Sequence, residues 1–324
     1  MKKEVNTIAV LTSGGDAPGM NGAVRAVVRT AIAKGLKVKG ILRGYEGLLK
    51  EEIMDMDART VSDTISRGGT ILYTSRCKEF HLPEYQDKAA EICRKHGIDG
   101  LVVIGGDGSF RGAQSLAERG INTIGIPGTI DLDIACTDYT IGFDTAVNTA
   151  MEAIDRIRDT STSHERVSVI EVMGRNAGYI ALWCGIANGA EDIFLPERNN
   201  YDEEKLLQHI IENRRQGKKH HIIINAEGVG HSEELAKKIE ERTGLIARAC
   251  ILGYIQRGGI PTATDRVHSS VMGAYAVDLL CDGKSNRVVA YKNGQYVDYD
   301  MEEALAMKKD LPEYTYQVSK YLTV

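Results

Sequence analysis

The sequence has little cysteine, and the cysteines it has are not clustered. Its six cysteines are scattered and form no Cys-x-x-Cys pair, a pattern that favours a reduced protein over a disulfide-bonded one. Long apolar runs are also missing, since none approaches the roughly 18 residues that span a bilayer. The N-terminal segment lacks the apolar stretch and small-residue cleavage site of a secretory leader. We therefore expect a cytoplasmic protein that has no membrane partner.

An excess of basic residues is absent as well. The formal net charge is −5 over 324 residues, whereas nucleic-acid-binding domains are usually basic, so we expect no nucleic-acid partner. Repeats and low-complexity tracts are likewise lacking. The apolar fraction of 43% supplies ample core material, and the length allows one large domain or two ordinary ones.

Short β-branched runs recur along the chain, and each ends in a glycine-rich or polar loop before a helical pattern. This alternation predicts an α/β fold with parallel sheets covered on both faces, in which ligands bind beyond the carboxyl ends of the strands. Because the runs form an early and a middle set, we expect two Rossmann-like lobes with mainly parallel sheets covered by helices, and an active site in the cleft between them. Examples of the runs are residues 7–11, 101–104, 121–126, 167–172 and 221–224.

The first helical pattern follows the first of these runs. It has an apolar stripe and ends near Gly35, a residue type common at helix C-termini. Arg25 and Arg29 lie one turn apart, off the stripe, and share a polar face. The stripe comprises Val24, Val27, Val28, Ala31 and Ile32.

Two glycine-rich loops, residues 12–22 and 105–109, each follow an apolar run. A strand, glycine loop and helix in this order present backbone N–H groups and a positive helix end to phosphate, although a tight turn is the alternative for the first loop. In the second loop, a side chain in place of Gly106 or Gly108 would block the close approach of a triphosphate. The carboxylate of Asp107 offers hard oxygen atoms, the ligands that Mg²⁺ prefers. Ser109 is either part of this site or a helix cap.

Thr129, Asp131 and Asp133 form a third candidate, in a loop bent by glycine and proline. A sugar hydroxyl is a poor nucleophile until its proton is accepted, and a carboxylate within hydrogen-bond reach can accept it. The alternative is an acidic turn held by side-chain hydrogen bonds to its own backbone. Beside the glycine loops, the trio favours phosphoryl transfer from a nucleotide to a hydroxyl.

Arginines recur near the expected strand ends. Arginine binds phosphate bidentately, and phosphoryl transfer needs fixed cations, although each arginine taken singly is also compatible with a solvated surface position. The histidines and cysteines show no structural-zinc spacing. The arginines are Arg76, Arg166, Arg175, Arg248 and Arg257.

Taken in order, these segments resemble the bacterial-type ATP-dependent 6-phosphofructokinase family over nearly the whole chain. The resemblance implies a larger ATP-binding lobe of residues 1–142 plus about 255–305, and a smaller sugar-phosphate-binding lobe of residues 143–254 plus about 306–324. It also implies a homotetramer with ADP or phosphoenolpyruvate as effectors. The matching segments are residues 11–21, 67–70, 105–109, 127–131, 158–160, 164–166, 171–175 and 256–259.

The resemblance implies a role for individual residues. Asp131 would take the proton from the 1-hydroxyl of fructose 6-phosphate, supported by Thr129, Asp133 and Arg175, and Asp107 would hold Mg²⁺ on the ATP phosphates. The ATP site would comprise Gly15, Arg76, Cys77, Gly106, Asp107, Gly108 and Ser109. The sugar phosphate would meet Thr129, Asp131, Met173, Gly174, Arg175, Glu227, Tyr254 and Arg257, with Arg166 and Arg248 from a neighbouring subunit. The effector site would comprise Arg25, Arg29, Asp63, Arg158, Gly189, Glu191, Lys218 and Lys219.

Two positions bear on the phosphoryl donor. Family members that use pyrophosphate resemble this pattern but carry Asp where Gly108 stands and Lys where Gly128 stands. Those side chains would occupy space that the ATP α-phosphate needs. Because both positions are glycine here, ATP is the expected donor.

The chain departs from the family pattern at several places. Leu132 replaces the Asn usual between the two aspartates, Tyr254 replaces a His that helps bind the 6-phosphate, and His81 stands where an Arg often faces the nucleotide. Ala58 and Gln216 replace effector-site arginines, so we expect an altered effector response.

The predicted function is ATP-dependent phosphorylation of fructose 6-phosphate to fructose 1,6-bisphosphate with allosteric regulation. Two alternatives stay open at this point. One is a catalytically weak paralogue that regulates or binds a sugar phosphate, and the other is a kinase of a different ketose phosphate.

Overall fold

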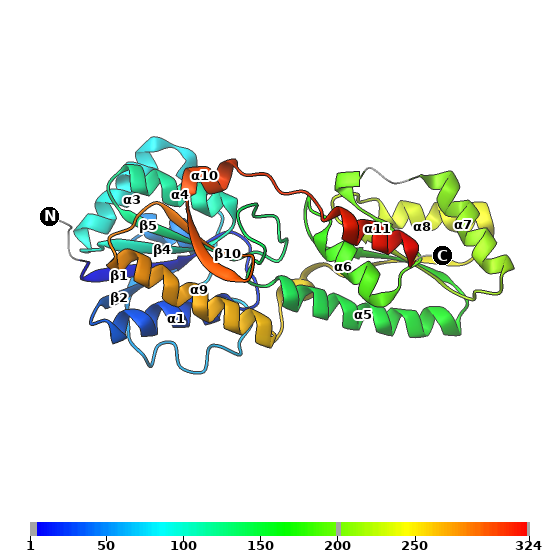
Figure 1. The fold of residues 1–324 in the computed structure, drawn as a ribbon, viewed down its shortest axis with the longest axis horizontal. Coiled ribbons are helices and arrows are strands. Elements are labelled where there is room, and N and C mark those ends of the chain that lie inside the picture. The colour runs from blue at the N-terminus through cyan, green and yellow to red at the C-terminus, as the bar shows by residue number, and fades with distance from the viewer. Residues whose placement is uncertain (1–4, 199–201, 323–324) are drawn as a thin grey trace. The chain divides into compact units, whose positions relative to one another are not determined.

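The computed structural model describes residues 5–198 and 202–322 (Figure 1). The chain divides into two compact units, and both contain mainly parallel sheet covered by helices, which confirms the α/β prediction with two lobes. Asp131–Asp133 belong to unit 2, although their place in the chain assigned them to the larger lobe. Unit 1 takes the chain up to Ile130, Ile134–Thr145 and Arg257–Lys309; unit 2 takes Asp131–Asp133, Ala146–Gln256 and the chain from Asp310.

Among the described residues, unit 1 contains a seven-stranded sheet in the order β11-β10-β5-β4-β1-β2-β3. The pairs β2–β3 and β10–β11 at its two edges are antiparallel, and the other pairs are parallel. The central strands are buried along their length because helices cover both faces. The strands are β1 (Thr7–Thr12), β2 (Lys37–Ile41), β3 (Ile53–Met56), β4 (Gly100–Gly105), β5 (Asn122–Pro127), β10 (Arg287–Lys292) and β11 (Gln295–Asp300).

The helices of unit 1 form one layer on each face of this sheet (Figure 1). Side chains alternate along a strand, so Leu101 and Val103 join the core formed with α3 and α4. Gly100 lies on the opposite face, where an added Cβ would stand 3.0 Å from Leu280 of α9. The helices are α1 (Met20–Ala33), α2 (Gly44–Leu49), α3 (Pro83–Lys95), α4 (Asp107–Glu118), α9 (Ala263–Cys281) and α10 (Met301–Ala306), with a 3₁₀ turn at Lys78–His81.

Helix α1 largely confirms the stripe predicted from the sequence. Four of its members are fully buried, and the helix ends just before Gly35, whose φ of +78° places it in the left-handed region. Ile32 is the exception: its side chain is 38% exposed and lines a cavity with Leu36 and Val38, although its neighbour Ala31 in the same turn is fully buried. The buried members are Val24, Val27, Val28 and Ala31.

Unit 2 contains a parallel sheet in the order β7-β8-β6-β9 within the described ranges. Val167 and Val169 pack with α7 and α8 in one core. Ser168 points to the other face, where its Oγ lies 2.6 Å from Oγ of Ser161 on α5. The elements are β6 (Val167–Val172), β7 (Asp192–Phe194), β8 (His221–Ala226), β9 (Ala247–Ile251), α5 (Phe143–Ser163, counted with unit 1 up to residue 145), α6 (Tyr179–Asn188), α7 (Glu203–Arg215), α8 (Ser232–Thr243), α11 (Glu313–Tyr321) and 3₁₀ turns at Pro196–Arg198 and Gly253–Arg257. Across the described part of the chain, we find no helix whose length and apolar character suit a bilayer span.

Asp265, in the first turn of α9, is a buried carboxylate that fastens this helix to the segment leading into α5. Its Oδ1 accepts hydrogen bonds from the Tyr139 hydroxyl (2.5 Å) and the Gly142 N–H (2.6 Å). Its Oδ2 accepts from the N–H (2.9 Å) and hydroxyl of Thr145. Burial raises the pKa of Asp265, while these hydrogen bonds favour its charged form.

We expect Asp265→Ala to lower the free energy of unfolding of unit 1 by about 3 kcal/mol, because four donors would lose their shared acceptor in a buried place. Thermal melting followed by circular dichroism measures this loss. The matched control is Asp278→Ala, since Asp278 lies on the same helix, is 46% exposed and pairs with Lys34 at 2.9 Å. That control should change stability by no more than about 0.5 kcal/mol, and equal losses in both variants would contradict the role assigned to Asp265.

Candidate active site

The loops that follow β1, β4 and β5 lie at one edge of the unit 1 sheet, because these three strands are parallel neighbours. Two backbone hydrogen bonds join them just past the strand ends. The Ser13 N–H donates to the Ile104 carbonyl, and the Gly128 N–H donates to the Gly105 carbonyl, both at 2.9 Å. The fold therefore places the two glycine-rich loops predicted from the sequence next to each other.

The first glycine loop is shaped by left-handed backbone and fastened to a second segment. Gly14 has a φ of +89°, a conformation that L side chains rarely adopt. The Thr74 hydroxyl donates to the Gly14 carbonyl at 2.8 Å, and two residues later the chain reaches Arg76 and Cys77. Burial raises the pKa of the Cys77 thiol. The structure thus brings the segment of Arg76 and Cys77 to the loop that holds Gly15.

The second glycine loop leads directly into α4, whose first residue is Asp107. A Cβ added to Gly106 or Gly108 would meet no described atom within 4 Å, whereas a Cβ on Gly105 would lie 2.6 Å from the Ser13 carbonyl oxygen. Gly105 is therefore required for packing, and the other two glycines border open space at the helix N-terminus. Backbone N–H groups in such a place bind phosphate.

Ser109 does not cap α4, which was one of its two predicted roles. Gly106 occupies the N-cap position without a side-chain cap, and Ser109 lies inside the first turn, where it is buried. Its carbonyl accepts a hydrogen bond from the Tyr45 hydroxyl at 2.6 Å. The backbone N–H groups at the start of α4 therefore stay available on the side where Gly106 and Gly108 border open space.

Arg257 contributes a cation to the same edge of unit 1. Its Nη1 donates to the Asp16 carbonyl at 3.0 Å, and a Cβ on Gly15 would stand 2.6 Å from that nitrogen. The guanidinium therefore lies directly against the first glycine loop. The carboxylate of Asp107 has the ligand chemistry that suits Mg²⁺, and Gly106 and Gly108 leave room beside it.

Unit 2 gathers a second group of predicted residues at the carboxyl ends of β6 and β8. The Arg175 N–H donates to Oε2 of Glu227 at 3.0 Å, and the Glu227 N–H donates to the Val172 carbonyl at 2.9 Å. Gly174 has a φ of +136°, and an added Cβ would lie 2.4 Å from the Ala177 carbonyl oxygen, so only glycine fits there. Backbone N–H groups and the Glu227 carboxylate thus hold together the group of Met173, Gly174, Arg175 and Glu227.

The acidic loop has an unusual backbone at its centre. Leu132, between Asp131 and Asp133, has a φ of +56°, in the left-handed region that an Asn adopts readily and a Leu does not. Holding a Leu there costs roughly 1 kcal/mol. Thr129 belongs to unit 1, while Asp131 and Asp133 belong to unit 2.

Arg166 and Arg248 lie at the opposite edge of the unit 2 sheet from Arg175. Arg166 directly precedes β6, and Arg248 pairs with Ser168 near the start of that strand. A six-residue strand is roughly 20 Å long, so neither arginine reaches the loops that follow β6 in the same chain. Arg248 is paired with Glu240 at 2.8 Å, and Tyr254 is 83% exposed. The structure therefore leaves Arg166 and Arg248 apart from Met173, Gly174, Arg175 and Glu227. Tyr254 lies in the same 3₁₀ turn as Gln256, which accepts a hydrogen bond from the Met173 N–H.

The residues expected at the effector site fall into two sets, one in each unit. In unit 2, Glu191 is buried, forms an ion pair with Lys218 and accepts a hydrogen bond from the Ile222 N–H at 2.5 Å. Arg158 donates to the Asn188 carbonyl, next to Gly189. The structure brings Arg158, Gly189, Glu191 and Lys218 into this part of unit 2. Arg25 and Arg29 of α1 and Asp63 are in unit 1.

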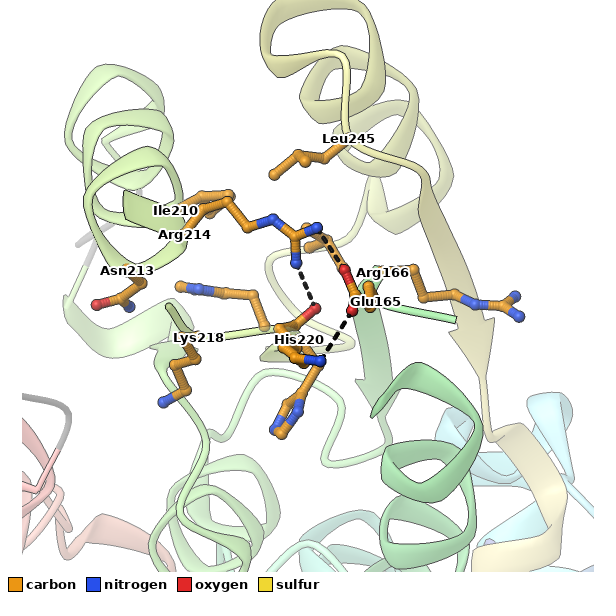
Figure 2. A pocket seen from close by; sticks show the side chains of 11 residues that line it. Glu165, Arg166, Ile210, Asn213, Arg214, Lys218, His220 and Leu245 are labelled. Carbon is orange, nitrogen blue, oxygen red and sulfur yellow. Dashed lines mark hydrogen bonds and ion pairs between the residues drawn. The ribbon is translucent and has the colours of Figure 1, made fainter. Parts of the chain in front are cut away.

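Lys219 lines a small cavity together with Lys218, Glu165 and Arg214. Figure 2 shows the side chains around this cavity. The Lys219 amine lies 3.2 Å from Glu165, which also accepts a hydrogen bond from Arg214 at 2.7 Å. The bonds from Arg214 and Lys219 hold the pKa of Glu165 below its usual value. In Figure 2 the Arg166 side chain extends away from this pair. The side-chain amide of Gln216 donates a hydrogen bond to Glu212 at 3.0 Å and is not part of the group formed by Glu165, Arg214 and Lys219.

Two structural partners were not assigned a role from the sequence. His220 lies 3.3 Å from Arg158 through Nε2, and burial lowers its pKa. Gln256 is fully buried and accepts the Met173 N–H at 3.2 Å. The run of Lys218, Lys219 and His220 that leads into β8 was the available signal for His220. For Gln256, the matching segment of residues 256–259 was the signal.

Comparison with known proteins shows the family to which the chain belongs. The phosphofructokinase family model matches residues 7–280. A curated relative from Clostridium botulinum (strain Loch Maree / Type A3), called ATP-dependent 6-phosphofructokinase, is 59% identical over 319 residues, which cover 98% of this chain and all of the relative.

Solved structures give the same result for the fold. Phosphofructokinase from Saccharomyces cerevisiae superposes with a TM-score of 0.88 at 34% identity over 98% of this chain, which spans 46% of the yeast chain. A pyrophosphate-dependent phosphofructokinase from Marinobacter aquaeolei superposes with a TM-score of 0.85 at 25% identity, over 96% of this chain and 86% of that one. This chain belongs to the phosphofructokinase family.

Proposed function

We propose that this protein transfers the γ-phosphoryl group of ATP to the 1-hydroxyl of fructose 6-phosphate, which yields fructose 1,6-bisphosphate and ADP. The observation that carries the proposal is the open start of α4, where Asp107 stands between two glycines whose added Cβ atoms would meet no described atom. The curated relative named ATP-dependent 6-phosphofructokinase, similar over its full length, supports the same reaction.

In this proposal, Asp131 is the general base. It accepts the proton of the 1-hydroxyl as the sugar oxygen forms its bond to the γ-phosphorus, and the bond from that phosphorus to the bridging oxygen of ADP breaks. Thr129 and Asp133 support this group. Arg175 supplies positive charge to the equatorial oxygens of the transferring phosphoryl group, where charge is spread in the transition state.

The nucleotide is held by unit 1. The N–H groups at the start of α4 and in the loop of Gly15 donate to the phosphates, and Arg76, Cys77 and Ser109 complete the site. Asp107 would hold Mg²⁺. When bound, this ion neutralises charge on the β- and γ-phosphates and keeps them aligned for in-line displacement.

The sugar phosphate contacts the backbone-held group of Met173, Gly174, Arg175 and Glu227, and Arg257 binds its 6-phosphate. Tyr254 can donate a hydrogen bond to that phosphate but carries no charge near neutral pH. Arg166 and Arg248 lie at the edge of the unit 2 sheet opposite to Arg175. This position supports the proposal that they bind the sugar phosphate of a neighbouring subunit. The enzyme is therefore proposed to act as a homotetramer in the cytoplasm.

Regulation is part of the proposal. A nucleoside diphosphate such as ADP, or phosphoenolpyruvate, would bind the basic groups of α1 and of the segment before β8, which are Arg25, Arg29, Arg158, Lys218 and Lys219. Asp63, Gly189 and Glu191 would border that site. Ala58 and Gln216 bring no cation to it, so the response to effectors is expected to be weak.

A side-by-side assay of donors and acceptors tests the function. With Mg²⁺ and fructose 6-phosphate, kcat/KM for ATP should exceed that for pyrophosphate at least about 100-fold, since Gly108 leaves room for the α-phosphate. Gly128 does not border the same open space, because a Cβ added there would stand 3.0 Å from Ile104 and 3.1 Å from Met20. Among fructose, tagatose and sedoheptulose phosphates, fructose 6-phosphate should give the highest kcat/KM. Efficient turnover with pyrophosphate, or none with ATP, would reject the proposal.

A further inference from the structure

Three side chains of unit 2 that have no part in the proposed reaction converge on one point. Asp192 begins β7, His209 lies on α7 and His221 begins β8. Oδ2 of Asp192 lies 3.1 Å from Nδ1 of His209 and 2.7 Å from Nε2 of His221. The three atoms all lie within 4.8 Å of one another, and the two imidazole rings meet edge to face. Two strands and the helix between them in the sequence thus bring two imidazoles and a carboxylate to one place.

The burial of this cluster is graded from one side to the other. The His221 side chain is 4% exposed, whereas Asp192 and His209 are 22% and 29% exposed. Nδ1 of His221 has no hydrogen-bond partner among the described residues, so its buried ring is held by Nε2 alone. Asp192 and His209 also line a cavity of about 350 Å³. An ion and a water molecule can therefore reach the cluster from the side of this cavity.

The donor set has the chemistry and the spacing of a metal site. Imidazole nitrogens and a carboxylate oxygen bind Zn²⁺ at about 2.0–2.2 Å, which separates neighbouring ligand atoms in a tetrahedron by roughly 3.3 Å. The observed separations of 2.7 and 3.1 Å need to widen by only a few tenths of an ångström. Two imidazoles favour a first-row transition ion over Mg²⁺ or Ca²⁺, which prefer oxygen ligands alone.

The charges around the cluster are compatible with a cation. The nearest acidic neighbour along the chain, Glu191, is paired with Lys218. Lys205, which lines the same cavity, lies 3.5 Å from Asp202. The carboxylate of Asp192, in contrast, is faced by the two histidines, which are neutral when they bind a metal.

We propose that Asp192, His209 and His221 bind one divalent first-row transition ion such as Zn²⁺, with water from the cavity as the fourth ligand. The ligand atoms are Oδ2, Nδ1 and Nε2 respectively. The ion joins the starts of two neighbouring strands to helix α7 and thereby stabilises unit 2. This site is independent of the phosphoryl-transfer reaction and of its Mg²⁺.

Titration of the metal-free full-length chain with Zn²⁺, against a chromogenic chelator and without nucleotide, tests the proposal. The wild-type chain should bind one equivalent that is lost in His209→Gln and in Asp192→Asn, each lowering the affinity by roughly 100-fold or more. Co²⁺ bound at the same site should show the visible absorption of a four-coordinate ion. Zn²⁺ should also raise the melting temperature of the wild-type chain and leave that of His209→Gln unchanged.

The matched control is His231→Gln, because His231 belongs to the same unit, is 77% exposed and contacts a single carboxylate, Glu234, at 3.4 Å. This control should bind Zn²⁺ as the wild type does. Cys281→Ser, carried in the reference chain and in every variant, removes an exposed thiol, a type of group with affinity for Zn²⁺. Equal Zn²⁺ affinity in the wild type, His209→Gln and Asp192→Asn would overturn the proposal, as would the absence of a tight equivalent in the wild type. Kinase activity measured without Zn²⁺ tests the proposed function separately.

Discussion

Replacing Asp131 by Asn is expected to lower kcat with ATP and fructose 6-phosphate by a factor of about 10² to 10⁴, the usual contribution of a general base. Asn keeps the shape of the side chain and removes the carboxylate that we propose accepts the proton of the 1-hydroxyl. Binding of the sugar phosphate should change much less, because in the proposed site other residues contact the phosphate and the other hydroxyls. Coupled detection of fructose 1,6-bisphosphate measures kcat, and calorimetry measures the dissociation constant.

Asp131→Ser and Asp133→Asn complete this experiment. The serine variant should match the asparagine variant if the lost charge is what matters. Asp133 shares the loop and its left-handed turn at Leu132, so Asp133→Asn controls for any disturbance of this strained backbone. We expect the Asp133 variant to lose clearly less activity than either Asp131 variant. A kcat within a few-fold of the wild type for Asp131→Asn would exclude a general-base role.

Replacing Gly108 by Asp is expected to lower kcat/KM for ATP about 100-fold, equivalent to ~2.7 kcal/mol. The new carboxylate would project from the first turn of α4 into the space that no described atom occupies within 4 Å of a Cβ, and there it would repel the α-phosphate. The fold should tolerate the change, since an acidic residue near a helix N-terminus is favourable. Steady-state kinetics and thermal melting together separate the two effects.

Two alanine variants sharpen this test. Gly108→Ala adds a methyl group without charge, so it should reduce kcat/KM for ATP less than the aspartate does. At Gly105 a Cβ would stand 2.5 Å from Oγ of Ser109 and 2.6 Å from the Ser13 carbonyl oxygen, so Gly105→Ala should destabilise unit 1 by about 1–3 kcal/mol. If Gly108→Asp instead melts early and keeps its ATP kinetics, the glycine serves packing and the account of donor choice is wrong.

The strands and the helix starts could be predicted from the sequence because their signals are local. The β-branched runs at residues 101–104 and 167–172 became β4 and β6, and the loop of residues 105–109 leads into α4 as expected. The edge strands β3 and β11 of unit 1 were not among the predicted runs, and neither were their neighbours β2 and β10. β3 and β11 are partly exposed and lack a continuous apolar run, so the pattern typical of buried parallel strands is absent from them.

Side-chain roles were harder to predict because they depend on which residues meet. Ser109 had the right residue type for a cap, but the helix begins two residues earlier and the side chain is buried. Ile32 had the right spacing for the apolar stripe, but its side chain is 38% exposed and borders a cavity. In both cases the local pattern was correct and the surroundings decided the outcome.

The sequence alone indicated the family and the α/β class. Its glycine motifs and acidic loop are properties of neighbouring residues, and the order of the segments can be read directly along the chain. Only the tertiary structure separated Gly105, which packing requires, from Gly108, which borders open space. It likewise placed Arg166 at the far edge of its sheet from Arg175, and it brought Asp192, His209 and His221 together from three elements. Such relations depend on strand order and on the packing of helices across a sheet, where the interacting residues are distant in the chain and no local pattern records them.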